Sequence, residues 1–171
     1  VVLGRNHGTM MIAEESTAWP KVTGKPEEEG LGFSMKWNMG WMHDFLDYMK
    51  LDPYFRSYNH NKMTFSMTYA FSEKYVLVLS HDEVVHMKGS MINKMPGEYD
   101  DKFANLKAGY SFMMGHPGKK LLFMGQDFAQ FREWSEAREL DWYLLAEEKH
   151  VQMKNFVREL LHLYQGSPAL Y

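Results

Sequence analysis

One stretch decides the fold class of this 171-residue chain: Tyr75-Val76-Leu77-Val78-Leu79, followed by Ser80-His81-Asp82-Glu83. Its first five residues are continuously apolar, as expected for a parallel strand that is buried on both faces. Polar side chains that can do chemistry follow at the point where such a strand leaves its sheet. The stretch therefore predicts an α/β fold with functional groups at the carboxyl end of this strand.

Outward from this stretch, three more apolar runs predict strands: Thr9–Ala13, Gly32–Trp37 and Leu121–Gly125. A loop rich in turn formers follows the first run. Apolar side chains at helical spacing predict helices over three segments: Trp41–Met49, Phe103–Met114 and about Glu147–Tyr164. A fourth segment, Tyr54–Ala70, is expected to be irregular at first and then helical. Strands separated by helices predict parallel βαβ units. A full (β/α)8 barrel takes about 250 residues, so the chain is predicted to hold half of one, as a single partial domain over residues 1–171.

Composition excludes several functional classes. The chain has 19 Lys and Arg against 22 Asp and Glu, a balance that offers no electrostatic footprint for nucleic acid or an anionic membrane. It has no cysteine, which excludes a disulfide scaffold and a thiolate nucleophile. His81 and His86 are five residues apart, whereas the zinc-protease helix needs two histidines four apart. We therefore expect a cytoplasmic enzyme.

Catalytic groups of barrel enzymes lie at the carboxyl ends of the strands. That rule selects a set of candidates after the first three predicted strands: Glu14, Glu15, Trp37, Asn38, His81, Asp82 and Glu83. Two carboxylates on separate strands suit glycosidic chemistry, which needs a proton donor and negative charge near an oxocarbenium-like transition state. By itself the pattern is weak, because a carboxylate after a strand is more often a helix cap or a solvated loop residue.

Longer motifs carry a resemblance that covers nearly the whole chain in the same order. They closely resemble the glycogen branching enzymes of the α-amylase superfamily at several places: Gly8-Thr9-Met10-Met11-Ile12-Ala13-Glu14-Glu15-Ser16-Thr17, Lys36-Trp37-Asn38-Met39-Gly40-Trp41-Met42-His43-Asp44, Leu79-Ser80-His81-Asp82-Glu83-Val84-Val85-His86 and Pro117-Gly118-Lys119-Lys120-Leu121-Leu122-Phe123-Met124-Gly125. The implied fold is strands five to eight, the C-terminal half, of a TIM (β/α)8 barrel.

The resemblance also implies roles for individual residues. Glu14 would be the general acid/base after the fifth strand, and Asp82 the third catalytic carboxylate after the seventh. His81 would contact substrate, as would Trp37 and Asn38 after the intervening strand. The implied substrate is an α-1,4 glucan such as glycogen or amylose. A chain cleaved from it would pass to a glucan 6-hydroxyl and form an α-1,6 branch. This implied chemistry needs no metal and no organic cofactor.

One expected part is missing. The family's nucleophile is an Asp after the fourth strand, and the segment before the first predicted strand, residues 1–8, contains no Asp. The 171 residues alone are therefore expected to be inactive, and the open half-barrel is expected to self-associate. Two alternatives remain, an α-amylase-like glucan hydrolase and a non-catalytic glucan-binding or structural module.

Overall fold

The computed structural model describes residues 2–171, so Val1, the start of the predicted domain, lies outside the described residues. It contains one parallel sheet in which neighbouring strands follow one another in the chain: β1 (Ile12–Ala13), β2 (Met35–Trp37), β3 (Tyr75–Leu79) and β4 (Lys119–Leu122). Sequential parallel order is the order of barrel strands. The predicted parallel α/β class is confirmed, and the arrangement is compatible with half of a barrel.

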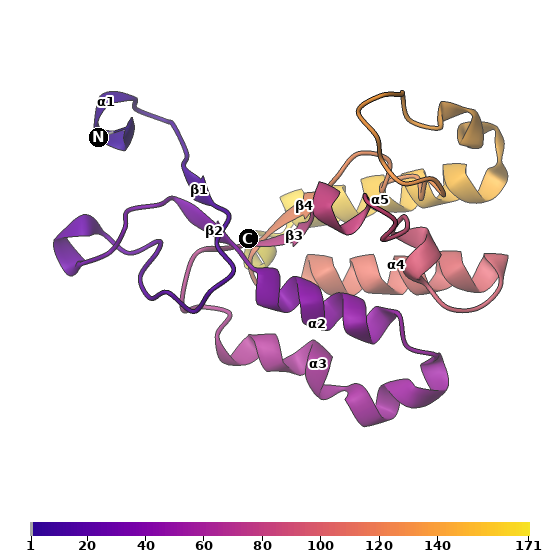
Figure 1. Ribbon diagram of the computed structural model, residues 1–171, viewed down its shortest axis with the longest axis horizontal. Helices are drawn as coiled ribbons and strands as arrows, with labels where there is room; N and C mark the ends of the chain where they lie inside the picture. Colours follow the sequence, from indigo (N-terminus) through magenta and orange to yellow (C-terminus); the bar gives the residue numbers. More distant parts are fainter. Residues whose placement is uncertain (1) are drawn as a thin grey trace.

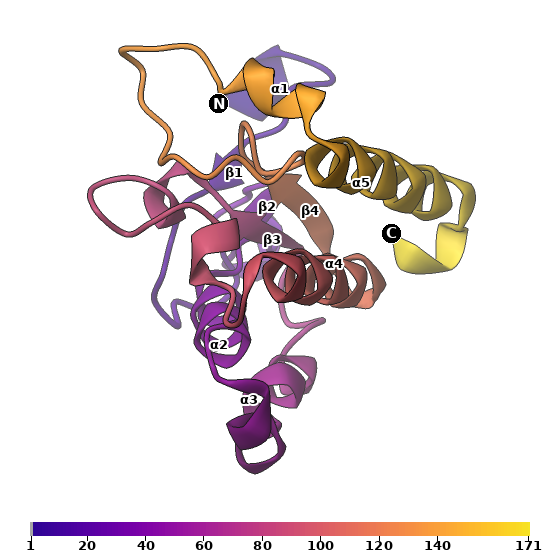
Figure 2. The same cartoon turned by 90° about the vertical axis from the view of Figure 1, so that its right-hand side faces the viewer.

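Helices cover one side of this sheet. The α-helices are α1 (Val2–Arg5), α2 (Met39–Met49), α3 (Asn61–Thr64), α4 (Tyr99–Gly115) and α5 (Glu148–Gly166), and the longer 3-10 segments are Pro53–Asn59, Phe65–Thr68 and Trp142–Ala146. Figure 2 shows α2 and α4 on one side of the sheet, whereas the long segment after β4 runs on the other side.

The strand predictions are confirmed in position but not always in length. β3 spans the predicted residues, because it has a strand on each side and is buried from Val76 onward. β1 keeps only the last two of its five predicted residues, and β2 only the last three of its six. β4 begins at Lys119, two residues before the predicted start, because Lys119 pairs with Val76 of β3.

The first crossover lacks an α-helix, in line with the loop predicted after the first strand. Between β1 and β2 the chain forms a loop whose only helical turn is the 3-10 segment Pro26–Glu28, as its turn formers predicted. Glu29 closes that turn in the left-handed conformation, with φ of 64°. The segment Tyr54–Ala70 was expected to begin irregularly. Its first part is instead 3-10 helix that starts at Pro53, where Asp52 caps the first turn.

The apolar core lies between β3, α2 and α4. Trp41 stacks on Phe45 in α2 with ring centroids 4.8 Å apart. Gly109 brings α4 against this face, since a Cβ there would lie 3.1 Å from both Phe45 Cζ and Met49 Cε. The packing anchors β3 firmly, and β3 carries the His81 motif at its end. No helix among residues 2–171 is long and apolar enough to cross a membrane.

Candidate active site

A tight 3-10 turn, His81–Glu83, follows β3 directly. Ser80 caps it in a reciprocal arrangement: the Glu83 carboxylate accepts from the Ser80 backbone N–H at 2.5 Å and from its hydroxyl at 2.8 Å. Glu83 is buried, so its carboxylate serves the turn rather than solvent. The same turn leaves His81 and Asp82 partly exposed side by side, with Nε2 of the imidazole 3.3 Å from Oδ1 of the carboxylate.

The segment after β4 supports the far side of this turn. The Phe123 ring lies 5.8 Å from the His81 ring, and Trp134 meets Phe123 edge to face at 5.1 Å. The Gln126 side chain donates to the carbonyl of Leu79 at 3.0 Å. The imidazole therefore stands against an aromatic wall at the carboxyl edge of the sheet.

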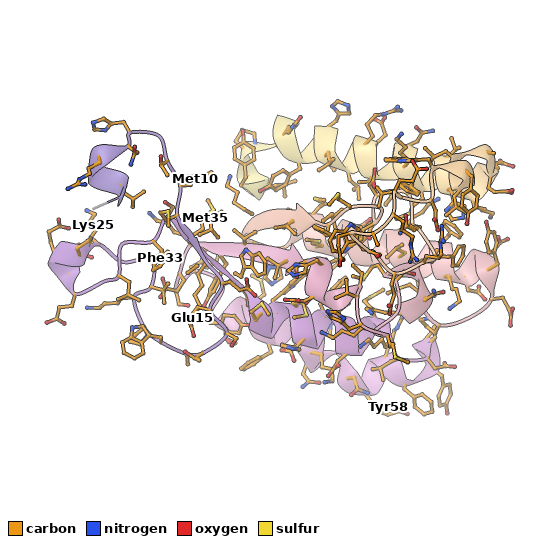
Figure 3. The ribbon with its side chains drawn as sticks, turned by 45° about the horizontal axis from the view of Figure 1, so that its top comes forward. Met10, Glu15, Lys25, Phe33, Met35 and Tyr58 are labelled. Atoms are coloured by element: carbon orange, nitrogen blue, oxygen red, sulfur yellow. The ribbon has the colours of Figure 1, made fainter. Side chains whose placement is uncertain are left out.

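The two adjacent glutamates after β1 have different surroundings. The Glu15 carboxylate pairs with the Lys36 ammonium at 2.6 Å and accepts from the Thr17 backbone N–H at 2.7 Å. The hydrogen bond from Lys36, followed by that from Thr17, lowers the pKa of Glu15 to about 2. Glu15 lies on the α2 side of β1 and β2 (Figure 3). The side chain of Glu14 is exposed and makes no hydrogen bond or ion pair within residues 2–171.

Trp37 and Asn38 lie in a different place from His81 and Asp82. They line a pocket of about 740 Å³ beside α2, together with Glu15 and Tyr69. The Asn38 carboxamide oxygen caps α2 by accepting from the Trp41 backbone N–H at 2.9 Å. The pocket lies beside the helix-free crossover from β1 to β2, and neither Glu14 nor the His81–Asp82 pair lines it.

Burial changes the acidity of one group in this pocket. Burial, followed by the charge of Asp44, raises the pKa of the Tyr69 hydroxyl to about 12. Tyr69 therefore stays neutral and can serve only as a hydrogen-bonding partner at ordinary pH. This pocket combines aromatic rings with charged groups, among them the Glu15–Lys36 pair and Asp44.

Sequence reasoning missed the supporting side chains. Glu83 and Gln126 were selected only by their positions after a strand. Nothing in the sequence indicated that Gln126 bonds the end of β3, or that Glu133 and Trp134 bond the loop after it. No periodicity could reveal them, because they belong to an irregular segment whose contacts are 40 or more residues away. Within the described residues no group of three or more His, Cys, Asp or Glu side chains could hold a metal ion.

Comparison with known proteins gives consistent relatives. No protein-family model matches the chain. The chain is 64% identical over 171 residues to the 1,4-alpha-glucan branching enzyme GlgB of Butyrivibrio fibrisolvens, covering 100% of this chain and 27% of that protein. The Gloeobacter violaceus enzyme of the same name is 62% identical over 164 residues, which cover 96% of this chain and 22% of that protein.

A third relative extends the same pattern. The Rhizobium etli 1,4-alpha-glucan branching enzyme GlgB 1 is 58% identical over 170 residues, 99% of this chain and 23% of that protein. The chain thus spans about a quarter of the length of the curated relatives it matches. Along its whole length it is homologous to one segment of the 1,4-alpha-glucan branching enzymes, as its motifs predicted.

Proposed function

We propose that this segment supplies the acid/base part of a retaining branching reaction on α-1,4 glucans. One observation carries the proposal: a free carboxylate, Glu14, and the His81–Asp82 pair follow two parallel strands of one sheet. The carboxyl ends of parallel strands meet at one edge, and that edge is the catalytic end of a barrel. The strands would be the fifth to eighth of that barrel, within a catalytic domain of a cytoplasmic enzyme.

In this proposal Glu14 performs both proton transfers. It protonates the leaving glycosidic oxygen while a nucleophilic carboxylate from outside these 171 residues attacks the anomeric carbon. It then takes the proton from the 6-hydroxyl of an acceptor glucan, which attacks the glycosyl-enzyme intermediate and forms the α-1,6 branch. Its freedom from internal partners suits this role, because the carboxyl must carry a proton in one step and lose it in the next.

Glu15 is unsuited to the same task. A carboxyl whose pKa is held near 2 by Lys36 stays ionised and cannot donate a proton near neutral pH. Its ion pair instead anchors the loop after β1 to β2, and so fixes the backbone that presents Glu14. Glu14 would thus transfer protons, and Glu15 would hold the loop in place.

Asp82 and His81 would act on the sugar. The carboxylate can accept hydrogen bonds from hydroxyls of the distorted ring, and the imidazole can donate one. Such bonds accelerate the reaction to the extent that they strengthen in the transition state. Trp37 and Asn38 would contribute to binding glucan beyond the reacting bond.

A segment replacement tests the proposal. Residues 1–171 would replace the matching 171 residues of the Butyrivibrio fibrisolvens enzyme, whose identity of 64% favours a folded chimera. In this chimera Glu14→Gln and Asp82→Asn should each lower the branching rate on amylose by about 10²- to 10⁴-fold. Glu15→Gln, the matched change one residue away, should keep much of the activity. The reverse ranking of the two glutamates would refute the assignment.

A further inference from the structure

The loop between the His81–Glu83 turn and α4 contains two adjacent residues in an unfavourable conformation. His86 has φ of 56° and Met87 has φ of 67°, both in the left-handed region. Residues other than glycine rarely adopt this backbone conformation, because their Cβ crowds the following carbonyl oxygen. Met87 is also 97% exposed, so no burial of its own side chain compensates for the strain. Such a conformation persists only where its surroundings enforce it.

A single carboxylate enforces it from the opposite loop. Oε2 of Glu133 accepts from the Met87 backbone N–H at 3.0 Å, and Oε1 accepts from the Gly89 N–H at 2.5 Å. Backbone N–H groups that converge in this way form a concavity that binds anions. The two bonds, that from Gly89 first, lower the pKa of the Glu133 carboxyl, so it is ionised at neutral pH.

The strained loop is linked in turn to the His81–Glu83 turn. The Lys88 ammonium donates to the backbone carbonyl of Asp82 at 2.8 Å. Next to Glu133, the Trp134 backbone N–H donates to the carbonyl of Val84 at 3.0 Å, directly after the turn. The Trp134 indole also packs on Phe123, which stands against His81.

The half-buried ammonium of Lys94 holds the loop from its other side. The Lys94 side chain, half-buried, donates to the carbonyls of Lys88 and Gly89 at 2.5 and 2.9 Å. The backbone of residues 87–89 is therefore held through its N–H groups by an anion and through its carbonyls by a cation. Loss of either partner would release its own half of these hydrogen bonds.

We infer that Glu133 is a positioning residue for Asp82 and His81: it holds the 86–89 loop in its strained conformation, and that loop fixes the turn. This inference rests on the proposed function, because it gives Glu133 a purpose only if Asp82 and His81 act on the sugar. Glu133 touches no substrate and transfers no proton. Its effect should therefore fall on the rate of the chemical step more than on substrate binding.

The test uses the same full-length chimera. Glu133→Gln keeps the shape but replaces one acceptor oxygen by a donor that opposes the backbone N–H groups. Because misplacing a reacting group by about 1 Å can cost about 10²-fold, we expect kcat to fall about 10- to 100-fold with little change in KM. Glu136→Gln, an exposed glutamate three residues along the same segment, is the matched control and should leave kcat unchanged.

Two further variants keep the test decisive. Met87→Gly removes the steric reason for strain, so added to Glu133→Gln it should recover part of the lost kcat per folded molecule, with the folded fraction of each variant measured by circular dichroism; a loss of folded protein alone would leave the rate per folded molecule unchanged. Lys88→Met removes only the bond to the Asp82 carbonyl from an exposed side chain, and should lower kcat even if Glu133→Gln fails to fold.

The outcomes separate this inference from the proposed function. Loss of activity in Glu14→Gln and Asp82→Asn, with Glu133→Gln indistinguishable from Glu136→Gln, would overturn the positioning role alone. Absence of rescue by Met87→Gly, or an unchanged kcat in Lys88→Met, would also overturn it. Full activity in Glu14→Gln and Asp82→Asn would instead refute the proposed function.

Discussion

The edge strand β1 and the inner strand β3 differ sharply in how they are packed. At β1, Ile12 is 42% exposed and Met10, two residues earlier, is 64% exposed. At β3, Leu77, Val78 and Leu79 are fully buried. Figure 1 shows the same contrast, with the N-terminal part of the chain extending away from the helices that surround β3.

Both strands are nevertheless followed by candidate catalytic groups. Asp82 follows the well-packed strand and is reinforced by a capping box, an aromatic wall and the Glu133 loop. Glu14 follows the poorly packed strand, where the main support within residues 2–171 is the ion pair of its neighbour Glu15 with Lys36. Sequence motifs select candidate groups after both strands equally. Packing determines which of these groups residues 2–171 can hold in place alone.

The largest expected effect concerns activity. A polypeptide of these 171 residues alone should form no α-1,6 branches from amylose. Acid/base groups without a nucleophile cannot form the covalent intermediate that retention requires. Iodine staining and counting of α-1,6 linkages would measure it, with the unmodified chimera as the positive control. Robust branching by the purified chain would show that the poorly packed end is catalytically sufficient.

The contrast in packing predicts unequal effects on stability. Leu77→Ala removes a fully buried side chain and should lower the free energy of unfolding by about 2–5 kcal/mol. Ile12→Ala removes a side chain that is 42% exposed, and should cost roughly 1 kcal/mol, because only part of its burial is lost. Urea unfolding of both variants would measure the difference. Equal losses would mean that β1 is as well anchored as β3.

How much the sequence could predict follows the same contrast. The continuous apolar run of β3 predicts a buried strand, and the predicted bounds match those of β3 to the residue. The run before Glu14 is equally apolar, but strand length depends on hydrogen bonds to a neighbour, and within residues 2–171 β1 pairs on one side only. Composition cannot reveal how many neighbours a strand has.

The candidate site was predictable to a similar degree. Strand-end position and motif together located Glu14, His81 and Asp82. The separate pocket at Trp37 and Asn38 was not foreseen, because its lining comes from segments that are far apart in the sequence. The left-handed backbone at Met87 gives no sequence signal either, since a methionine there does not suggest that conformation.

The exposed strand edges predict self-association. β1 and β4 are the outer strands of the sheet, and each pairs on only one side within the described residues. The 126–140 segment, which could have covered an edge, packs instead against the loop after β3 through Glu133 and Trp134. An open edge is a template for pairing, so the 171-residue chain should associate in a concentration-dependent way.

A charge at the edge tests that prediction. Ile12→Lys should weaken association, because a charge on an edge strand disfavours pairing. Leu31→Lys, at a side chain that is 53% exposed in the β1–β2 loop, is the matched control and should have little effect. Light scattering after size exclusion, with dye binding for exposed apolar surface, would measure both. A monodisperse monomer without dye binding would count against pairing.

The smallest expected effect concerns the ion pair that supports the poorly packed end. The pKa of Glu15 falls from 4.5 to about 2 in the folded chain, chiefly because of Lys36. Between these two values the unfolded chain binds a proton that the folded chain does not. The stability that the pair contributes is therefore fully present above pH 4.5, and is lost as the pH falls from 4.5 to about 2.

Glu15→Gln should remove this part of the acid sensitivity. Its free energy of unfolding should be lower than that of the unmodified chain above pH 4.5, and the two should converge as the pH falls through about 2, where Glu15 itself becomes protonated. Glu27→Gln, an exposed glutamate in the first crossover, is the matched control and should follow the unmodified chain throughout. Urea unfolding at several pH values would measure the three curves. If Glu15→Gln also followed the unmodified chain, the Lys36 pair would not hold the loop after β1, and Glu14 would depend for its position on contacts outside these residues.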